Sequence, residues 1–488
     1  MTAKKNISTR LASQMITMLC GLVIPRLLLR AYGSETYGIT VSVAQLLSYV
    51  TLLEGGIGGV ARAELYAPLA GKDQARISSV YHGVRHFFRN VALVYLGYSA
   101  ALGIFFKEIA HVSAFSRGYL FALVMSISVA SLGKYMSGLA DLTLISADKK
   151  NYVNNIVVII TTLANAAVVS VTIALGWDIM AVKLLSSAVF LLRPVFYAAY
   201  VKKHYRIDRS GVQKAELKQK YSGIGQHIAY FLHTNMDIVL LTIFADARLV
   251  AVYSVYNMVI SNIRAIAEAF SNGMEAEFGE MIARGNQVQL RCAVRKYQRL
   301  IAAATTVLFG CAGILIVPFV RLYTAGIEDA QYIQPLFALI LLLAEALNCL
   351  MIPYSALPVA SNRIRQTQWG AYAEAALNLV CSLVLMQYHP LLGAAAGTLI
   401  ATVFRSVYYL SDAGKNVLHA CPGKLVFSVL LQCAILTAVV LAGRRLIAHA
   451  EIHDFLSWAL CGAAAFGCLS LIAAAGYKMK DLQEGRLL

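Results

Sequence analysis

Long apolar runs separated by short polar segments repeat along the whole chain. Each run is about 20 residues long, which as a helix is enough to cross the roughly 30 Å hydrocarbon core of a bilayer. An open backbone in lipid would leave its N–H and C=O groups unpaired, so each run predicts a helix. The pattern predicts fourteen spans, at about 9–30, 36–58, 87–106, 118–140, 152–174, 179–200, 222–245, 249–270, 298–320, 332–356, 367–387, 391–411, 424–443 and 455–476.

The composition fits a chain that lies mostly inside a membrane. Of its 488 residues, 59% are hydrophobic and 14% are charged, and the mean hydropathy is +0.65. A soluble domain carries roughly 25% charged residues. The sequence therefore indicates an all-α polytopic membrane protein. The segment MTAKKNISTRLASQ leads into an apolar run too long for a signal peptide, with no small-residue cleavage site after it, so we expect the first span there.

The basic residues outside the predicted spans alternate along the chain. The large majority of them fall in the N-terminal segment and in every second connection after it. Cytoplasmic loops carry such an excess, so the pattern predicts that both termini are cytoplasmic. The net charge of +17 then reflects membrane topology, and we expect no nucleic acid as a partner.

The strongest break in the hydrophobic pattern is the basic segment KKHYRIDRSGVQKAELKQK at 202–220. It either lies along the anionic inner leaflet or is a solvated linker. A faint similarity between 28–43 and 240–255 suggests an internal repeat of six spans, a common plan for transporters. The expected parts are an N-lobe at 1–201, a cytoplasmic linker at 202–221, a C-lobe at 222–415, and two further spans with a cytoplasmic tail at 416–488.

Six basic residues lie inside the predicted spans, where a charge at the bilayer centre costs at least about 2.5 kcal/mol. Three lie near helix ends, where their side chains can reach the interface, namely Lys134, Lys183 and Arg405. Three lie deeper and are candidates to line a water-filled cavity, namely Arg26, Arg193 and Arg264. Pro25 removes a backbone hydrogen bond directly before Arg26, which indicates either a bent helix with a cation in a wet interior or a kink that serves packing alone.

Acidic residues in the spans add candidates for ion coupling. Glu268 follows Arg264 by four residues on one helical face, where the two side chains either act in transport or neutralise each other. His233 and Asp237 have the same spacing, which suits either a proton relay or a hydrogen-bonded structural pair. Glu54 precedes a glycine cluster that allows close packing or a hinge.

The sequence lacks the common signatures of catalysis and of cofactor binding. It contains no GxxxxGK[ST], no HExxH, no dinucleotide fingerprint and no GxSxG. None of its cysteines has a metal-site spacing. We therefore expect no catalytic residues, no cofactor and no metal site, and a protein that is not an enzyme.

The segment GLVIPRLLLRAYGSETYGITVSVAQLLSYVTLLEGGIGG at 21–59 resembles the start of the Wzx-type polysaccharide transporters. These O-antigen, capsule and teichoic oligosaccharide flippases belong to the MOP (MATE-like) exporter superfamily and are related to lipid II flippases. The matching elements are Pro25-Arg26, Gly33, Tyr37-Gly38 and Glu54-Gly55. The lipid II flippases have a further arginine in span 2, whereas this chain has only Arg62 just beyond that span.

This resemblance implies two six-helix lobes around a central cavity, with two C-terminal helices added. It implies a flippase that moves polyprenyl (undecaprenyl) diphosphate-linked oligosaccharide across the bacterial cytoplasmic (inner) membrane by alternating access, for surface polysaccharide such as lipopolysaccharide. It implies a cation role for Arg26 and Arg264, and Arg193 is a further candidate. The expected partners are the lipid-linked oligosaccharide, membrane lipids, a polysaccharide polymerase and glycosyltransferases.

Three alternatives remain open at this stage. A MATE-like exporter of multidrug or organic-cation substrates would have a cavity dominated by carboxylates. A peptidoglycan lipid II flippase would share the fold and the cationic cavity. A sugar-polymer polymerase or ligase would need a sizeable outer loop or a clustered acid pair, and the sequence has neither.

Overall fold

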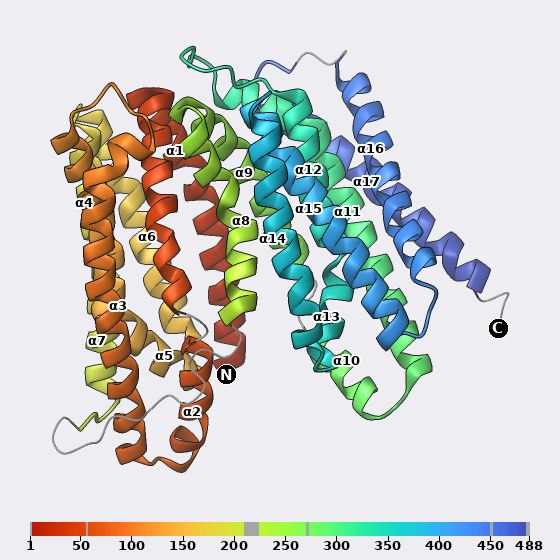
Figure 1. Ribbon diagram of the computed structural model, residues 1–488, viewed down its shortest axis with the longest axis horizontal. Helices are drawn as coiled ribbons and strands as arrows, with labels where there is room; N and C mark the ends of the chain where they lie inside the picture. Colours follow the sequence, from red (N-terminus) through yellow and green to blue (C-terminus); the bar gives the residue numbers. More distant parts are fainter. Residues whose placement is uncertain (1, 55–56, 209–223, 270–272, 449–451, 485–488) are drawn as a thin grey trace. The chain divides into compact units, whose positions relative to one another are not determined.

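The computed structural model of the protein describes residues 2–54, 57–208, 224–269, 273–448 and 452–484, and the regular secondary structure in these ranges is helical throughout (Figure 1). The chain divides into two compact units. Unit 1 comprises Met1–Phe231 and Ala245–Ala251, and unit 2 comprises Leu232–Phe244 and Val252–Leu488.

Unit 1 is a bundle in which α1 packs along α6, α3 along α4, and α7 against both α4 and α6 (Figure 1). Its elements are α1 (Thr2–Ser48), the 3-10 segment η1 (Tyr49–Glu54), α2 (Ile57–Gly71), α3 (Gln74–Ile109), α4 (Arg117–Gly133), the π-helical segment η2 (Lys134–Gly138), α5 (Leu139–Ala147), α6 (Asn151–Ala174) and α7 (Ile179–His204). Side-chain hydrogen bonds cap the N-termini of several of these helices. Asp73 accepts a hydrogen bond from the Arg76 amide (3.0 Å), and Asp178 accepts one from the Met180 amide (2.9 Å).

Unit 2 is built mainly on the helix pair α14 and α15, with α12 against α15 and α11 against α17 (Figure 1). Its elements are α10 (Met274–Ala283), α11 (Gln287–Tyr323), α12 (Pro335–Leu350), α13 (Ile352–Ala360), α14 (Ile364–Met386), α15 (Pro390–Asp412), the π-helical segment η3 (Ala413–Val417), α16 (Pro422–Ile447) and α17 (Phe455–Glu484). Two helices contribute residues to both units, namely α8 (Ile224–Phe244) and α9 (Ala247–Ala269).

The predicted spans all correspond to helices. In the described residues, eleven helical segments are long and apolar enough to cross a membrane, or twelve if one bent pair counts as a span. The first of these, Lys4–Glu54, contains two predicted spans that meet at Gly33, whose backbone angles (φ 76°, ψ 172°) are not helical. A shorter apolar helix, Thr234–Phe244, lies at the predicted seventh span. The prediction of an all-α multi-pass membrane protein is confirmed.

The structure differs from the sequence prediction in the connections. The expected loops 59–86 and 271–297 contain α2 and α10, and α7 continues to His204. The expected span 332–356 is broken at Met351, where α12 and α13 meet at an angle of 41°. The bend occurs because Pro353, two residues further on, cannot donate a backbone hydrogen bond. Most of the expected linker lies outside the described residues.

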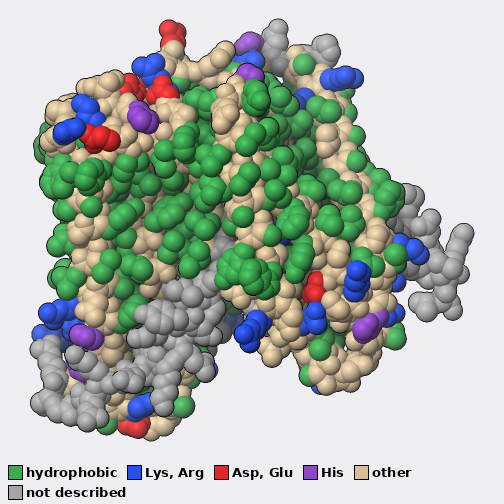
Figure 2. All heavy atoms as spheres, viewed as in Figure 1, with side chains coloured by type: hydrophobic (Ala, Val, Ile, Leu, Met, Phe, Trp, Pro, Cys, Tyr) green, Lys and Arg blue, Asp and Glu red, His purple; other side chains and the backbone are tan. Residues whose placement is uncertain are grey.

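The surface is that of a protein in lipid. Figure 2 shows hydrophobic side chains over the middle part of the visible face of each unit, with Lys and Arg mainly toward the ends of the helices. Leu93 on α3 and Leu471 on α17 are examples of large apolar side chains that are more than half exposed. Such surface is unfavourable in water and favourable against acyl chains.

The motif Tyr37-Gly38 marks a close contact between two backbones in unit 1. A Cβ atom on Gly38 would lie 1.8 Å from the carbonyl oxygen of Ala247, at the start of α9. One residue further on, the Arg248 guanidinium lies 3.4 Å from the Glu35 carboxylate. Only glycine permits this approach, so the motif has a packing reason.

We expect Gly38→Ala to destabilise the protein by about 1–3 kcal/mol, because the added methyl group overpacks a backbone contact. Thermal unfolding of the detergent-solubilised protein, followed by size-exclusion chromatography, measures the effect. Gly21→Ala in the same helix is the matched control, since no atom lies within 4 Å of its Cβ position. A Gly38→Ala protein as stable as the Gly21→Ala protein would contradict the packing role.

Candidate functional site

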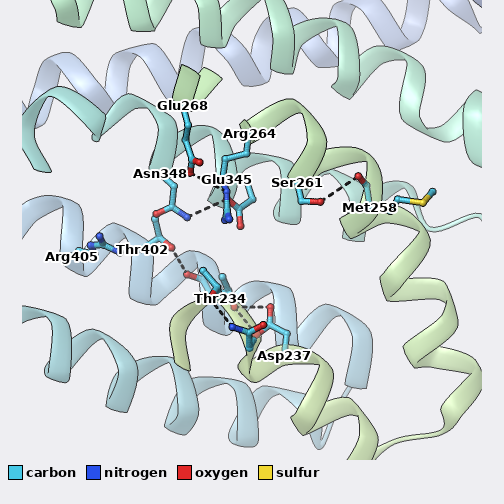
Figure 3. A network of polar contacts seen from close by, with 12 residues as sticks. Thr234, Asp237, Met258, Ser261, Arg264, Glu268, Glu345, Asn348, Thr402 and Arg405 are labelled. Atoms are coloured by element: carbon cyan, nitrogen blue, oxygen red, sulfur yellow. Dashed lines mark hydrogen bonds and ion pairs between the residues drawn. The ribbon is translucent and has the colours of Figure 1, made fainter. Parts of the chain in front are cut away.

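Arg264 forms a charge cluster in unit 2 with two carboxylates (Figure 3). Its Nη1 lies 3.1 Å from Glu345 Oε2 on α12, and its Nε lies 3.3 Å from Glu268 Oε1 one turn further along α9. Asn348 Nδ2 also donates to Glu345 Oε2, at 3.4 Å. The predicted i,i+4 pair therefore exists, and a second acid from another helix joins it. In this conformation the arginine is compensated by acids on two sides.

A second ion pair joins α14 to α15. Arg405 Nη1 lies 3.4 Å from Glu374, whose side chain is almost fully buried. The Arg405 guanidinium also lies 5.4 Å from the centre of the Tyr409 ring. Arg405 is thus paired within the protein, whereas the sequence suggested that it reaches the membrane interface.

Asp237 on α8 is buried and is held by hydroxyl groups. Tyr253 Oη donates to its Oδ2 (2.8 Å), and Thr398 Oγ1 on α15 lies 2.8 Å and 2.9 Å from its two carboxylate oxygens. No Lys, Arg or His of the described chain forms an ion pair with it. Asp237 therefore differs from Glu345 and Glu374, each of which has an arginine.

More neutral oxygen atoms surround Asp237. Thr398 Oγ1 lies 3.3 Å from Asn378 Oδ1 on α14, and Ser382 Oγ donates to the same amide oxygen at 3.0 Å. These helices approach closely because α15 carries Gly397, where a Cβ would lie 2.1 Å from Ser382 Oγ. Asn378 Nδ2 is buried without a hydrogen-bond partner, and turning the amide over would leave its oxygen there instead. The cluster combines one carboxylate, neutral oxygens and one unsatisfied amide atom.

Arg26 and Arg193 occupy different settings in unit 1. Arg26 is half-buried on α1, which continues through Pro25 as a helix. Arg193 on α7 donates from Nε to Thr161 Oγ1 on α6 (2.8 Å), and its guanidinium lies 4.5 Å from the centre of the Phe190 ring. Arg193 therefore holds two helices of one bundle together through neutral groups.

Glu54 ends η1 and is held by η2. Lys134 Nζ lies 3.0 Å from Glu54 Oε1, and Tyr135 Oη donates to the same oxygen at 2.7 Å. The π-helical turn of η2 presents these two consecutive residues to one carboxylate. Glu54 thus connects the end of the second predicted span to the end of α4. Of the other predicted coupling residues, His233 has a side chain that lies outside the described residues.

Sequence reasoning did not select Tyr253, Asn378 or Thr398, although they complete the site around Asp237. Neutral polar residues are frequent in spans and cost little, so each alone carries little signal. The spacing offered one clue, because Glu374, Asn378 and Ser382 recur every four residues and form a polar stripe on α14. Among the described residues there is no group of three or more His, Cys, Asp or Glu that would hold a metal ion.

Comparison with known proteins identifies the fold only. No protein-family model matches the chain, and no curated protein matches it in sequence. Among solved structures, the lipid II flippase MurJ in an inward closed conformation matches with a TM-score of 0.68 and 14% identity, over 98% of this chain and 100% of that one.

Two transporter structures match less of the chain. The eukaryotic MATE transporter AtDTX14 has a TM-score of 0.56 and 14% identity, over 90% of this chain and 99% of its own. The MATE multidrug transporter DinF-BH has a TM-score of 0.57 and 15% identity, over 86% of this chain and 97% of its own. These similar structures are of transporters or flippases. The chain is a multi-pass membrane protein with the fold that MurJ and the MATE transporters share.

Proposed function

We propose that the protein is a flippase that moves polyprenyl diphosphate-linked oligosaccharide from the inner to the outer leaflet of a bacterial cytoplasmic membrane, with both termini cytoplasmic. The observation that carries this proposal is the extent of the structural match. A lipid flippase matches 98% of the chain, including the region of α16 and α17, whereas the two MATE structures described above match 86–90%. The resemblance of residues 21–59 to polysaccharide flippases is the reason why we propose an oligosaccharide as the headgroup of the transported lipid.

Arg26 is the cation that we assign to the substrate diphosphate. Arginine presents a planar fork of donors that suits phosphate oxygens. Arg26 follows Pro25 within a predicted membrane span. A cation at this depth can bind the diphosphate headgroup after it has left water, while the polyprenyl tail stays in lipid. Arg264 has two carboxylates beside it, so an anionic headgroup there would displace Glu345 or Glu268, or would bind when one of them is protonated. Both arginines stay assigned to the diphosphate, and binding at Arg264 depends on the state of its two carboxylates.

We expect Arg26→Gln to lower the rate of flipping at least tenfold at limiting substrate, since a hydrogen bond to a charged group contributes about 1.5–3 kcal/mol. The assay uses proteoliposomes that contain a fluorescent polyprenyl diphosphate oligosaccharide, and an impermeant reductant reports the label that reaches the outside. Arg10→Gln is the matched control, because Arg10 is exposed on the same helix. Flipping by Arg26→Gln protein at the Arg10→Gln rate would refute the assignment.

Asp237 is the residue that we assign to ion coupling. A buried carboxylate without a basic partner has to be neutralised by a proton or a cation. One negative charge among neutral oxygens matches a monovalent cation. A proton can also neutralise the carboxylate, against the preference of the two hydroxyl donors for its charged form. The chain carries no P-loop, so a proton or sodium gradient is the proposed source of energy. Glu268, Glu54 and His233 remain secondary candidates.

We expect Asp237→Asn to abolish the acceleration of flipping by an imposed proton or sodium gradient, because the amide keeps the shape but not the charge. Thr398→Val should weaken the same response by roughly tenfold, since it removes a hydrogen bond to the carboxylate. Thr305→Val is the matched control, because that hydroxyl is buried without a partner. Gradient-dependent flipping that persists in the Asp237→Asn protein would rule out this assignment.

A second candidate is an exporter of organic cations. The observation that favours it is a surplus of buried acids in unit 2. Three carboxylates are buried there, namely Asp237, Glu345 and Glu374. Among the described residues only two arginines pair with them, Arg264 with Glu345 and Arg405 with Glu374. The same proteoliposomes distinguish the two functions. Gradient-driven uptake of a lipophilic cationic dye, together with no movement of the labelled lipid, would establish the exporter and exclude the flippase.

A further inference from the structure

A groove runs along α3 in unit 1 and changes from basic to apolar along its length. It has a volume of about 640 Å³, and its basic end is formed by His82, Arg85, His86 and Arg89. These positions have the spacing i, i+3, i+4 and i+7, so they lie on one face of the helix. The same face continues with Leu93 and Leu96, so the residue pattern of a single helix sets both ends of the groove.

The apolar end faces outward. Leu93 and Met136 are 63% and 56% exposed, and Leu132 at the end of α4 completes the wall. Met136 lies in η2, where the π-helical turn widens the helix; such turns are frequent at functional sites. In a chain that crosses a membrane, exposed apolar surface of this kind is favourable against acyl chains.

The basic end lies where a lipid headgroup would be. Arg89 is at the start of the predicted span 87–106, and the eight residues from His82 to Arg89 extend about 10 Å along the helix from it. His82 bonds to the neutral carbonyl of Asp208 (2.8 Å). Within the described residues, no carboxylate forms an ion pair with Arg85 or Arg89, and both side chains are exposed. Two guanidinium groups therefore face the interface with no carboxylate in salt-bridge contact.

An adjoining pocket of about 340 Å³ shares His82 and Arg85 and adds Lys202 at the end of α7. It also contains Asp141, which is buried and accepts a hydrogen bond from Tyr81 (2.7 Å). That carboxylate disfavours an anion in the adjoining pocket. A phosphate group is best accommodated in the main groove, between Arg85 and Arg89.

We infer that this groove binds an acidic phospholipid of the inner leaflet, with its phosphate on Arg85 and Arg89 and an acyl chain along Leu93, Leu96 and Met136. Acidic lipid is attracted to basic residues near the membrane surface, and arginine matches phosphate geometry. The bound lipid would contact η2, whose Lys134 and Tyr135 hold Glu54, and would stabilise that turn. The inference does not depend on the transported substrate.

Native mass spectrometry of the full chain tests this inference, with equal amounts of phosphatidylglycerol and phosphatidylcholine of the same acyl length. We expect preferential retention of phosphatidylglycerol, and a loss of roughly tenfold in the Arg85→Gln/Arg89→Gln double variant. Arg284→Gln/Arg365→Gln is the matched control, since it removes two exposed arginines elsewhere and should keep the preference. Equal retention of both lipids by the unmodified chain, or unchanged preference in the groove variant, would overturn the proposal.

Met136→Trp tests the apolar end with all charges kept. The bulky ring should lower retention of long-chain phosphatidylglycerol and leave weak binding of glycerol phosphate unchanged. If glycerol phosphate competes as well as the whole lipid, the site is an anion site and the lipid assignment is wrong. If polyprenyl diphosphate oligosaccharide displaces phosphatidylglycerol from the unmodified chain but not from the groove variant, the groove belongs to the substrate and the proposal is overturned. The unfolding temperature of each variant reports whether it is folded.

Discussion

The need to compensate charge inside a membrane governs the interior of this protein. A charged side chain at the bilayer centre costs about 2.5–3.5 kcal/mol or more, so it is retained only with a partner or a function. Glu54 with Lys134, Arg264 with Glu345, and Arg405 with Glu374 are such partnerships. Each pair joins two different helical segments. Removal of one partner from a buried pair costs about 3–5 kcal/mol, so the pairs of Glu345 and Glu374, whose carboxylates are mostly buried, favour the observed helix packing. Lys134 is 45% exposed, so its pair with Glu54 contributes less.

Asp237 stands out against this background because its neighbours are neutral. Tyr253 and Thr398 provide donors, which stabilise a negative charge but do not cancel it. Asn378, beside Thr398, adds a buried amide atom with no hydrogen-bond partner within the protein. A buried carboxylate whose hydrogen-bond partners are all neutral is suited to take up a cation or a proton reversibly. We therefore propose Asp237 as the coupling residue because no basic side chain among the described residues forms an ion pair with it.

The sequence predicted the spans well because hydropathy over about 20 residues is set by the bilayer and needs no knowledge of packing. It also found Arg264 with Glu268, since that pair lies on a single helix. It did not find Glu345 as the second partner, because that residue is on another helix and contact between them depends on the fold. The π-helical turn at Lys134 was missed for the same reason, whereas the bend at Met351 has a local cause, Pro353, that the sequence analysis overlooked. The π-helical turn is a local irregularity that tertiary contacts such as the Glu54 pair stabilise against the regular helix.

The distribution of the pairs bears on how such a protein moves. Glu54 and Lys134 both belong to unit 1, whereas Arg264 with Glu345 and Arg405 with Glu374 belong to unit 2. None of these three pairs joins one unit to the other, so the charges in each pair are compensated within a single unit. The alternating access that we propose would therefore not require any of these three pairs to break, and the bending would fall on α8 and α9, which contribute residues to both units.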